Sequence, residues 1–185
     1  MLLLILGLVI FMSVHLIPTF VDLRQKLIAW KGKPVYTVGY SCAAMVGLIL
    51  IVIGKSRAIL VPVWDAPDWA YYLTPVFMLI ALTLLPAAYI PTNLKRFMRH
   101  PFLAGIALWA ISHLLVNGDL ASIILFGGFG AFALFDMWSS NRRGAEKSTT
   151  KVPIYRDILL LVVGAVAFSI ILHLHPYLFG VSAIP

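Results

Sequence analysis

The sequence predicts an all-α fold, a polytopic membrane bundle of six transmembrane helices with both termini on the non-cytoplasmic side. Of its 185 residues, 62% are hydrophobic and only 11% are charged, which leaves too little polar surface for a soluble domain of this size. The hydrophobic residues gather in six runs, most of them close to the roughly 20 residues that a helix needs to cross a bilayer. We therefore expect residues 1–185 to form a single domain in a lipid bilayer.

The six predicted spans follow one another with short connections. The first has no basic segment before it and no small-residue cleavage site, so we interpret it as a retained helix. Pro75 and Pro86 in the third span are tolerated in a membrane bundle, and the Gly127–Gly130 run in the fifth favours close approach of a neighbouring backbone over contact with a cofactor. The spans are Leu2–Phe20, Tyr36–Ile53, Ala70–Ile90, Pro101–Val116, Asp119–Trp138 and Asp157–His175.

The orientation comes from the basic residues. The loops after the first, third and fifth spans hold all but two of the 14 lysine and arginine residues, the exceptions being Lys55 and Arg57. The positive-inside rule places those three loops in the cytoplasm and both termini outside it. This placement explains the net charge of +7 without a nucleic-acid partner. The single cysteine, Cys42, excludes an intramolecular disulfide and any CxxC-type site.

Two acidic residues within or beside the spans have structural interpretations. Asp119 follows Gly118 in a tight connection, where the glycine can adopt a left-handed conformation and the carboxylate can cap the next helix. Asp136 lies near the cytoplasmic end of the fifth span, where Arg99 or Arg142 can neutralise it. Both interpretations are favoured over a catalytic carboxylate.

Three histidines lie at predicted helix ends. His100 precedes Pro101, which suits the first helical position, so His100 is expected to anchor or cap that helix. His173 and His175 are two residues apart and point to different faces, which argues against joint binding of one metal. His175 and Pro176 are expected to end the last helix at the membrane interface.

A glycine, an aromatic residue and a histidine recur at four-residue spacing in "GLVIFMSVH" and in "GIALWAISH". Residues four apart share one helix face. Two such faces, set against each other, would hold a large planar ligand between two axial nitrogens, and haem b is the obvious candidate. Alternatively, each histidine hydrogen-bonds across the bundle and the repeat arises by chance. The residues are Gly7, Phe11 and His15 in the first span, and Gly105, Trp109 and His113, continued by Asn117, in the fourth.

The depth of the two histidines leaves a second ligand pair open. At about 1.5 Å per residue, His15 lies about 8 Å from the cytoplasmic end of its span and His113 about 18 Å from the start of its own. Helix tilts of up to about 40° can close this gap. Otherwise His113 and His173, both in the outer half, form the alternative metal-ligand pair.

Four sequence blocks resemble the NnrU family of bacterial membrane proteins. They are "GLVIFMSVHLIP", "RHPFLAGIALWAISHLLVNGDL", "LFGGFGAFALFDMWSSNRR" and "VPI", and in this order they cover most of the chain. The family is associated with denitrification and nitric-oxide metabolism in the bacterial inner membrane. It is similar to the zeta-carotene isomerase of plants and cyanobacteria, which uses haem b with two axial histidines to isomerise a cis double bond when the iron is reduced.

This resemblance implies haem b with His15 and His113 as ligands. His100 and His175 have counterparts in the isomerase outside the ligand pair, whereas His173 has none. The loop after "NRR" is short here, and much of the isomerase's connecting sequence is missing. The resemblance therefore supports the haem site better than the carotene substrate.

Three functions are consistent with these features. The first is a bis-histidine haem-b protein that isomerises a membrane polyene or lipid, or that carries out electron transfer or nitric-oxide chemistry, with a membrane redox partner or as a homo-oligomer. The second is an S-adenosylmethionine-dependent membrane methyltransferase, in which Arg99, His100 and Gly105 would bind the cofactor. The third is a non-catalytic accessory subunit of a denitrification complex.

Overall fold

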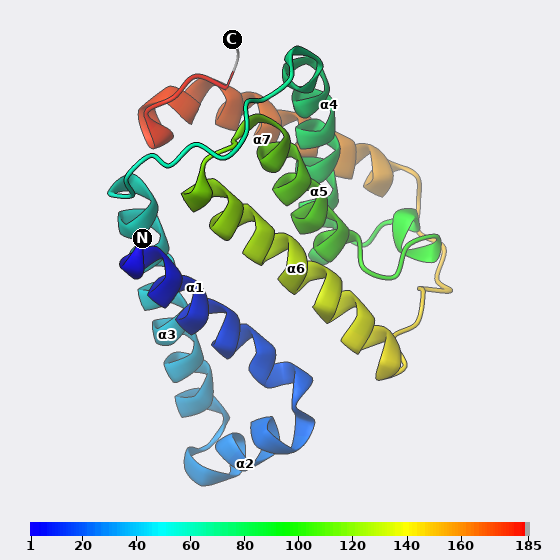
Figure 1. The fold of residues 1–185 in the computed structure, drawn as a ribbon. Helices are drawn as coiled ribbons and strands as arrows, with labels where there is room; N and C mark the ends of the chain where they lie inside the picture. Colours follow the sequence, from blue (N-terminus) through cyan, green and yellow to red (C-terminus); the bar gives the residue numbers. More distant parts are fainter. Residues whose placement is uncertain (184–185) are drawn as a thin grey trace. The chain divides into compact units, whose positions relative to one another are not determined.

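The computed structural model describes residues 1–183 and confirms the all-α class. These residues form seven α-helices and three short 3₁₀ helices without a strand (Figure 1). In order they are α1 (Leu2–Leu16), η1 (Ile17–Thr19), α2 (Val21–Lys31), α3 (Lys33–Ser56), α4 (Asp68–Leu84), η2 (Leu85–Ala88), η3 (Asn93–Arg96), α5 (Pro101–Val116), α6 (Leu120–Arg142) and α7 (Tyr155–Phe179).

The chain forms two compact units, and α6 contributes residues to both of them. Unit 1 contains residues 1–63 and 119–128, and unit 2 contains residues 64–118 and those from Phe129 onward. The expectation of a single domain over residues 1–185 stays a prediction.

In unit 1, α1 and α3 lie side by side (Figure 1). Their backbones approach closely because glycines occupy the contact. A Cβ atom added at Gly7 would lie 2.6 Å from the Ile51 amide nitrogen, and one at Gly47 would lie 2.8 Å from the Phe11 amide nitrogen. Gly54 meets the backbone of Leu4 in the same way. Small residues that let helix backbones approach are typical of membrane helix pairs.

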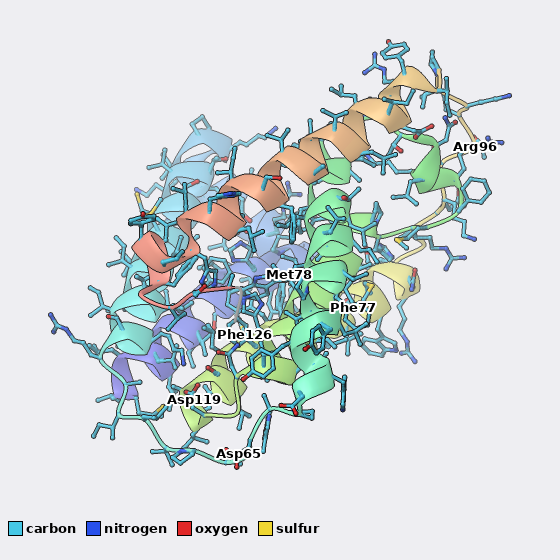
Figure 2. All side chains as sticks on the ribbon, turned by 90° about the horizontal axis from the view of Figure 1, so that it is seen from above. Asp65, Phe77, Met78, Arg96, Asp119 and Phe126 are labelled. Atoms are coloured by element: carbon cyan, nitrogen blue, oxygen red, sulfur yellow. The ribbon has the colours of Figure 1, made fainter. Side chains whose placement is uncertain are left out.

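In unit 2, α4 packs against both α5 and α7. Gly105 of α5 faces the Ala81 carbonyl of α4, and Gly164 of α7 faces the backbone and side chain of Thr83. Figure 2 shows Asp65 and Arg96 beyond opposite ends of α4. The connection that holds Asp65 and the one that holds Arg96 therefore lie at different ends of this helix.

Five segments are long and apolar enough to cross a membrane: Leu2–Thr19, Lys33–Ser56, Asp68–Ala88, Leu120–Arg142 and Tyr155–Phe179. The predicted fourth span is α5, which has only 16 residues. That length is about 24 Å, less than the roughly 30 Å of a bilayer's hydrocarbon core. The multi-pass membrane class is thus supported, while the sixth span and the sides of the termini stay predictions.

The outer surface of α7 supports a lipid environment. Leu161, Val162 and Ile170 keep 60%, 53% and 52% of their surface exposed. A water-facing helix would carry polar side chains at such positions. We conclude that much of this helix faces lipid.

The segment expected to be the first loop is mostly helical. α2 fills it, and Gly32 with φ 85° separates it from α3, where Pro34 stands in the first turn. Asp22 in its first turn and Lys31 in its last match the helix dipole. This helix was not predicted because its basic residues interrupt the run of apolar ones.

The last helix does not end at His175 and Pro176, and that prediction was wrong. α7 continues to Phe179 and stops at Gly180, which adopts φ 74°. The Gly180 amide donates to the Pro176 carbonyl at 2.9 Å. A proline lacks only its own amide donor, so the neighbouring residues can keep the helical path.

Candidate functional site

The histidine of the first repeat is held by its own helix. His15 Nδ1 lies 2.7 Å from the Phe11 carbonyl oxygen. Its ring stacks on the Phe11 ring, with centroids 4.1 Å apart and planes at 27°, and lies 5.3 Å from the Tyr40 ring of α3. The hydrogen bond to Phe11 and the rings of Phe11 and Tyr40 therefore help to orient the imidazole.

The second repeat has the same construction in α5. His113 Nδ1 lies 2.9 Å from the Trp109 carbonyl oxygen, and the two rings are 5.1 Å apart. Trp109 in turn meets Phe129 edge-on at 5.5 Å. Asn117 Nδ2 donates to the His113 carbonyl at 2.8 Å, so this amide caps the helix end.

These contacts select one tautomer of the neutral ring. A carbonyl oxygen only accepts a hydrogen bond, so in the neutral form of either histidine Nδ1 carries the hydrogen and the lone pair lies on Nε2. A neutral imidazole whose Nδ1–H is held by a carbonyl is the usual form of a metal-ligating histidine. The donor chemistry of both residues therefore fits axial ligation of haem iron. His173 shares this geometry through the Ser169 carbonyl at 2.7 Å.

The glycines of the two repeats have another role. The backbone of α3 occupies the space where a Gly7 side chain would lie, and a Cβ at Gly105 would lie 3.0 Å from the Ala81 carbonyl oxygen. Both positions serve helix packing within their units. Of each predicted face, the aromatic ring and the histidine are the residues that this packing does not account for.

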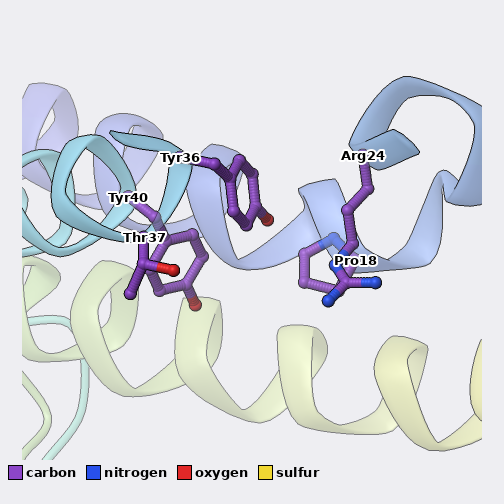
Figure 3. Close-up of a pocket in the computed structure, with 5 residues that line it drawn as sticks. All are labelled: Pro18, Arg24, Tyr36, Thr37 and Tyr40. Carbon is purple, nitrogen blue, oxygen red and sulfur yellow. The ribbon is translucent and has the colours of Figure 1, made fainter. Parts of the chain in front are cut away.

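A cavity of about 300 Å³ that is open at the surface of unit 1 lies beside Tyr40, and sequence reasoning missed it (Figure 3). The Arg24 guanidinium lies 6.0 Å from the centre of the Tyr36 ring. Tyr36 and Tyr40, four residues apart, project from one face of α3. That spacing was the only sequence signal, and the arginine joins it only through the fold. The lining residues are Pro18, Arg24, Tyr36, Thr37 and Tyr40.

The arginine and histidine of "RHP" bind a side chain of α6. Arg99 Nη1 donates to Asn141 Oδ1 at 3.2 Å, and His100 Nε2 lies 3.0 Å from the same oxygen. The side chain of His100 makes no capping bond to α5. Of its two expected roles, anchor and cap, His100 therefore has the first, because it holds the helix start to Asn141.

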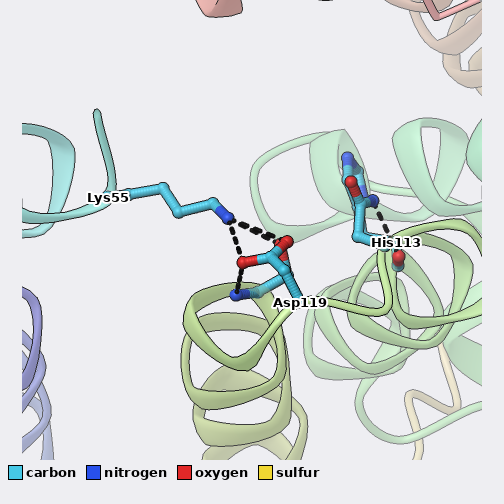
Figure 4. Close-up of polar contacts among 5 residues, drawn as sticks. Lys55, His113 and Asp119 are labelled. Atoms are coloured by element: carbon cyan, nitrogen blue, oxygen red, sulfur yellow. Dashed lines mark hydrogen bonds and ion pairs between the residues drawn. The ribbon is translucent and has the colours of Figure 1, made fainter. Parts of the chain in front are cut away.

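The capping prediction for Asp119 is confirmed, and the structure adds a partner (Figure 4). Asp119 Oδ1 accepts from the Ser122 amide at 3.0 Å, and Oδ2 accepts from the Ser122 hydroxyl at 2.5 Å. Lys55 Nζ forms an ion pair with the carboxylate at 3.0 Å. Partial burial raises the pKa of Asp119, but the bonds from Ser122 and Lys55 outweigh it and leave that pKa below its ordinary value.

Gly118 does not adopt the expected left-handed conformation, since positive φ angles in the described part of the chain occur only at Gly32, Gly144 and Gly180. Its small size is needed for another reason. A Cβ there would collide with the Trp64 carbonyl, and the Gly118 carbonyl accepts a hydrogen bond from the Trp64 amide at 3.2 Å. The glycine thus permits a close approach of two backbones.

The predicted partner of Asp136 was wrong. The carboxylate lies 3.8 Å from Arg143 Nη2, in place of Arg99 or Arg142. Seven residues are about two helical turns, which brings both side chains to one face. Arg142 instead lies over the Trp138 ring at 4.6 Å.

The packing interpretation of the Gly127–Gly130 run holds for two of its glycines. A Cβ at Gly128 would lie 3.2 Å from the Met12 Cε, and one at Gly130 would lie 3.4 Å from the Ala110 Cβ. The neighbours are side chains, whereas we expected a backbone.

An unpredicted polar cluster joins η3 to the start of α7. Asp157 accepts hydrogen bonds from the Thr92 hydroxyl at 2.5 Å, the Asn93 amide at 2.8 Å and Asn93 Nδ2 at 2.6 Å. Within residues 1–183 no three His, Cys, Asp or Glu side chains gather as a metal site would require. Axial ligation of haem needs only two.

Comparison with known proteins identifies the family. Neither the curated proteins nor the solved structures contain a significant match to this chain. The family model described as NnrU protein matches residues 3–183 of the 185. The resemblance carried by the four sequence blocks is therefore confirmed, and the chain belongs to the NnrU family.

Proposed function

We propose that this NnrU-family protein binds haem b in the bacterial inner membrane, with His15 and His113 as axial ligands. One observation carries the proposal. Both histidines donate Nδ1–H to the carbonyl four residues before them, which leaves the lone pair on Nε2, the atom that binds iron. His173 has the same geometry and is the alternative partner of His113.

The chain's own residues would orient the ligands and keep water from the ring. Phe11 stacks on His15, and Trp109 lies beside His113, so each imidazole has an aromatic neighbour that limits its rotation. When bound, haem b supplies reversible one-electron chemistry at its iron. Burial and hydrogen bonds to the ligands set its potential.

The reaction class follows from the resemblance to zeta-carotene isomerase and from the family's association with denitrification. It is either redox-dependent isomerisation of a membrane polyene or lipid, or electron transfer linked to nitric-oxide metabolism. A membrane redox partner or a second copy of the chain would then exchange the electron.

The test is the absorption spectrum of the detergent-solubilised protein, oxidised and reduced, with haem content measured as its pyridine complex. We expect a Soret band in the wild type, its loss in His113→Ala and in His15→Ala, and no change in the control His175→Ala. Loss in His173→Ala with retention in His15→Ala would assign the alternative pair. A protein that stays colourless after haem reconstitution, or a His113→Ala variant that keeps the band, would refute the proposal.

Two further measurements test the other two functions. Heat released on titration with S-adenosylmethionine would favour a methyltransferase. The residues expected to bind that cofactor have other partners here, since Arg99 and His100 contact Asn141, and Gly105 packs on α4. A stable, haem-free protein that copurifies with a denitrification enzyme would favour an accessory subunit.

A further inference from the structure

The cavity beside Tyr40 is lined by a cationic side chain that the haem proposal does not use. The Arg24 guanidinium reaches it from α2, next to Pro18 of η1, while Tyr36 and Tyr40 reach it from α3 (Figure 3). Salt bridges within residues 1–183 join Lys55 to Asp119 and Arg143 to Asp136. Arg24 therefore has no carboxylate partner in the described part of the chain.

The lining of this cavity is suited to an anion. A guanidinium presents a planar set of N–H donors that matches phosphate oxygens, and phenolic hydroxyls donate to the same group. The Thr37 hydroxyl donates to the Lys33 carbonyl at 2.9 Å, which leaves its oxygen to accept only. Asp22, the nearest acidic residue along α2, is not among the lining residues. The cavity volume of about 300 Å³ is about ten times the volume that one molecule occupies in liquid water.

The helix that carries Arg24 exposes apolar side chains beside basic ones. Trp30 is 75% exposed, Val21 47% and Leu23 46%. The same helix contributes Lys26 and Lys31. Basic side chains are attracted to anionic headgroups, and exposed apolar ones beside them can contact acyl chains.

We propose that Arg24, with Tyr36 and Tyr40, binds the phosphate of an anionic phospholipid in the leaflet where α2 lies. A lipid is favoured over a free phosphate because exposed apolar side chains on α2 would contact its acyl chains while the cavity takes its headgroup. This inference does not require haem, since no lining residue is a proposed iron ligand, although Tyr40 also lies beside the His15 ring.

The experiment uses the full chain in detergent and counts bound lipid by native mass spectrometry during titration with phosphatidylglycerol or phosphatidylcholine. We expect phosphatidylglycerol to bind more tightly. Arg24→Gln should weaken it about tenfold, the effect of losing a charge-assisted hydrogen bond, and Tyr36→Phe should weaken it about threefold. Lys26→Gln removes the same charge from α2 outside the cavity and should change affinity by less than about twofold.

Several outcomes would overturn the proposal. Equal affinity for the two lipids, or an equal effect of Lys26→Gln and Arg24→Gln, would reduce the site to a general basic surface. Displacement of phosphatidylglycerol by an equimolar amount of inorganic phosphate would assign a free-phosphate site. Loss of haem in Arg24→Gln with lipid binding unchanged would assign the arginine to the haem carboxylates. The thermal unfolding temperature of each variant, measured without added lipid, separates these outcomes from misfolding.

Discussion

The contact between α1 and α3 predicts that one methyl group at Gly7 destabilises the protein. In Gly7→Ala, the new Cβ would lie 2.6 Å from the Ile51 amide nitrogen and 2.8 Å from the Gly47 carbonyl oxygen, where ordinary contacts begin at 3.4 Å. Both obstacles are backbone atoms of α3, so no side chain can rotate away. The two helices would have to separate.

The magnitude follows from two opposing terms. Overpacking of this kind costs about 1–3 kcal/mol, and the better helix propensity of alanine returns up to about 1 kcal/mol. Gly39 provides the matched control, because it lies in α3 with no atom within 4 Å of its added Cβ. Gly39→Ala keeps the propensity gain without the clash, so we expect the two variants to differ by about 1–3 kcal/mol.

The assay is thermal unfolding in detergent, followed by loss of the monodisperse peak in size-exclusion chromatography. For a chain of this length, the expected difference corresponds to roughly 2–12 °C, with Gly7→Ala below Gly39→Ala. Equal midpoints for Gly7→Ala and Gly39→Ala would refute the packing of α1 on α3 at this position.

Three further predictions concern polar contacts and a second glycine. Asp119→Ala should cost about 1–3 kcal/mol through the lost cap and the unpaired Lys55. The folded-state pKa of Asp119 is lowered. Its contribution to stability is therefore complete above the ordinary aspartate pKa of about 4 and is lost as the pH falls through the lowered value. A series of unfolding midpoints measured at different pH values should show this loss in the wild type and not in Asp119→Ala. Asp157→Ala, which removes the acceptor for Asn93, should lower the midpoint in the same assay, and an unchanged midpoint would contradict the anchoring of α7. Gly118→Ala should reduce the yield of folded protein in detergent extracts, since its Cβ meets a backbone carbonyl; a normal yield would contradict that contact.

The parts of the fold that sequence reasoning predicted are those that depend on neighbouring residues. Apolar runs predicted the membrane helices because lipid requires about 20 apolar residues in a row. The cap at Asp119 was predictable because it binds Ser122, three residues later. The family was also recognisable from its motif blocks.

Errors arose where the local pattern allowed more than one outcome. Pro176 can end a helix or lie within one, and here α7 continues to Phe179. Asp136 had several basic residues within reach, and the helical period selects Arg143. The roles of His15 and His113 as iron ligands stay predictions, supported by the geometry of their Nδ1 atoms.

The sequence by itself determined the membrane class and the apolar helices, because hydrophobicity acts through each residue's own environment. The tertiary structure decided which residues meet. Lys55 pairs with Asp119 across 64 positions of the chain, and Gly7 contacts the backbone of α3. Arg24 reaches the tyrosines of α3 only because α2 is a helix that ends at Gly32. Such contacts depend on how helices pack, and the order of residues along one helix does not specify its neighbour.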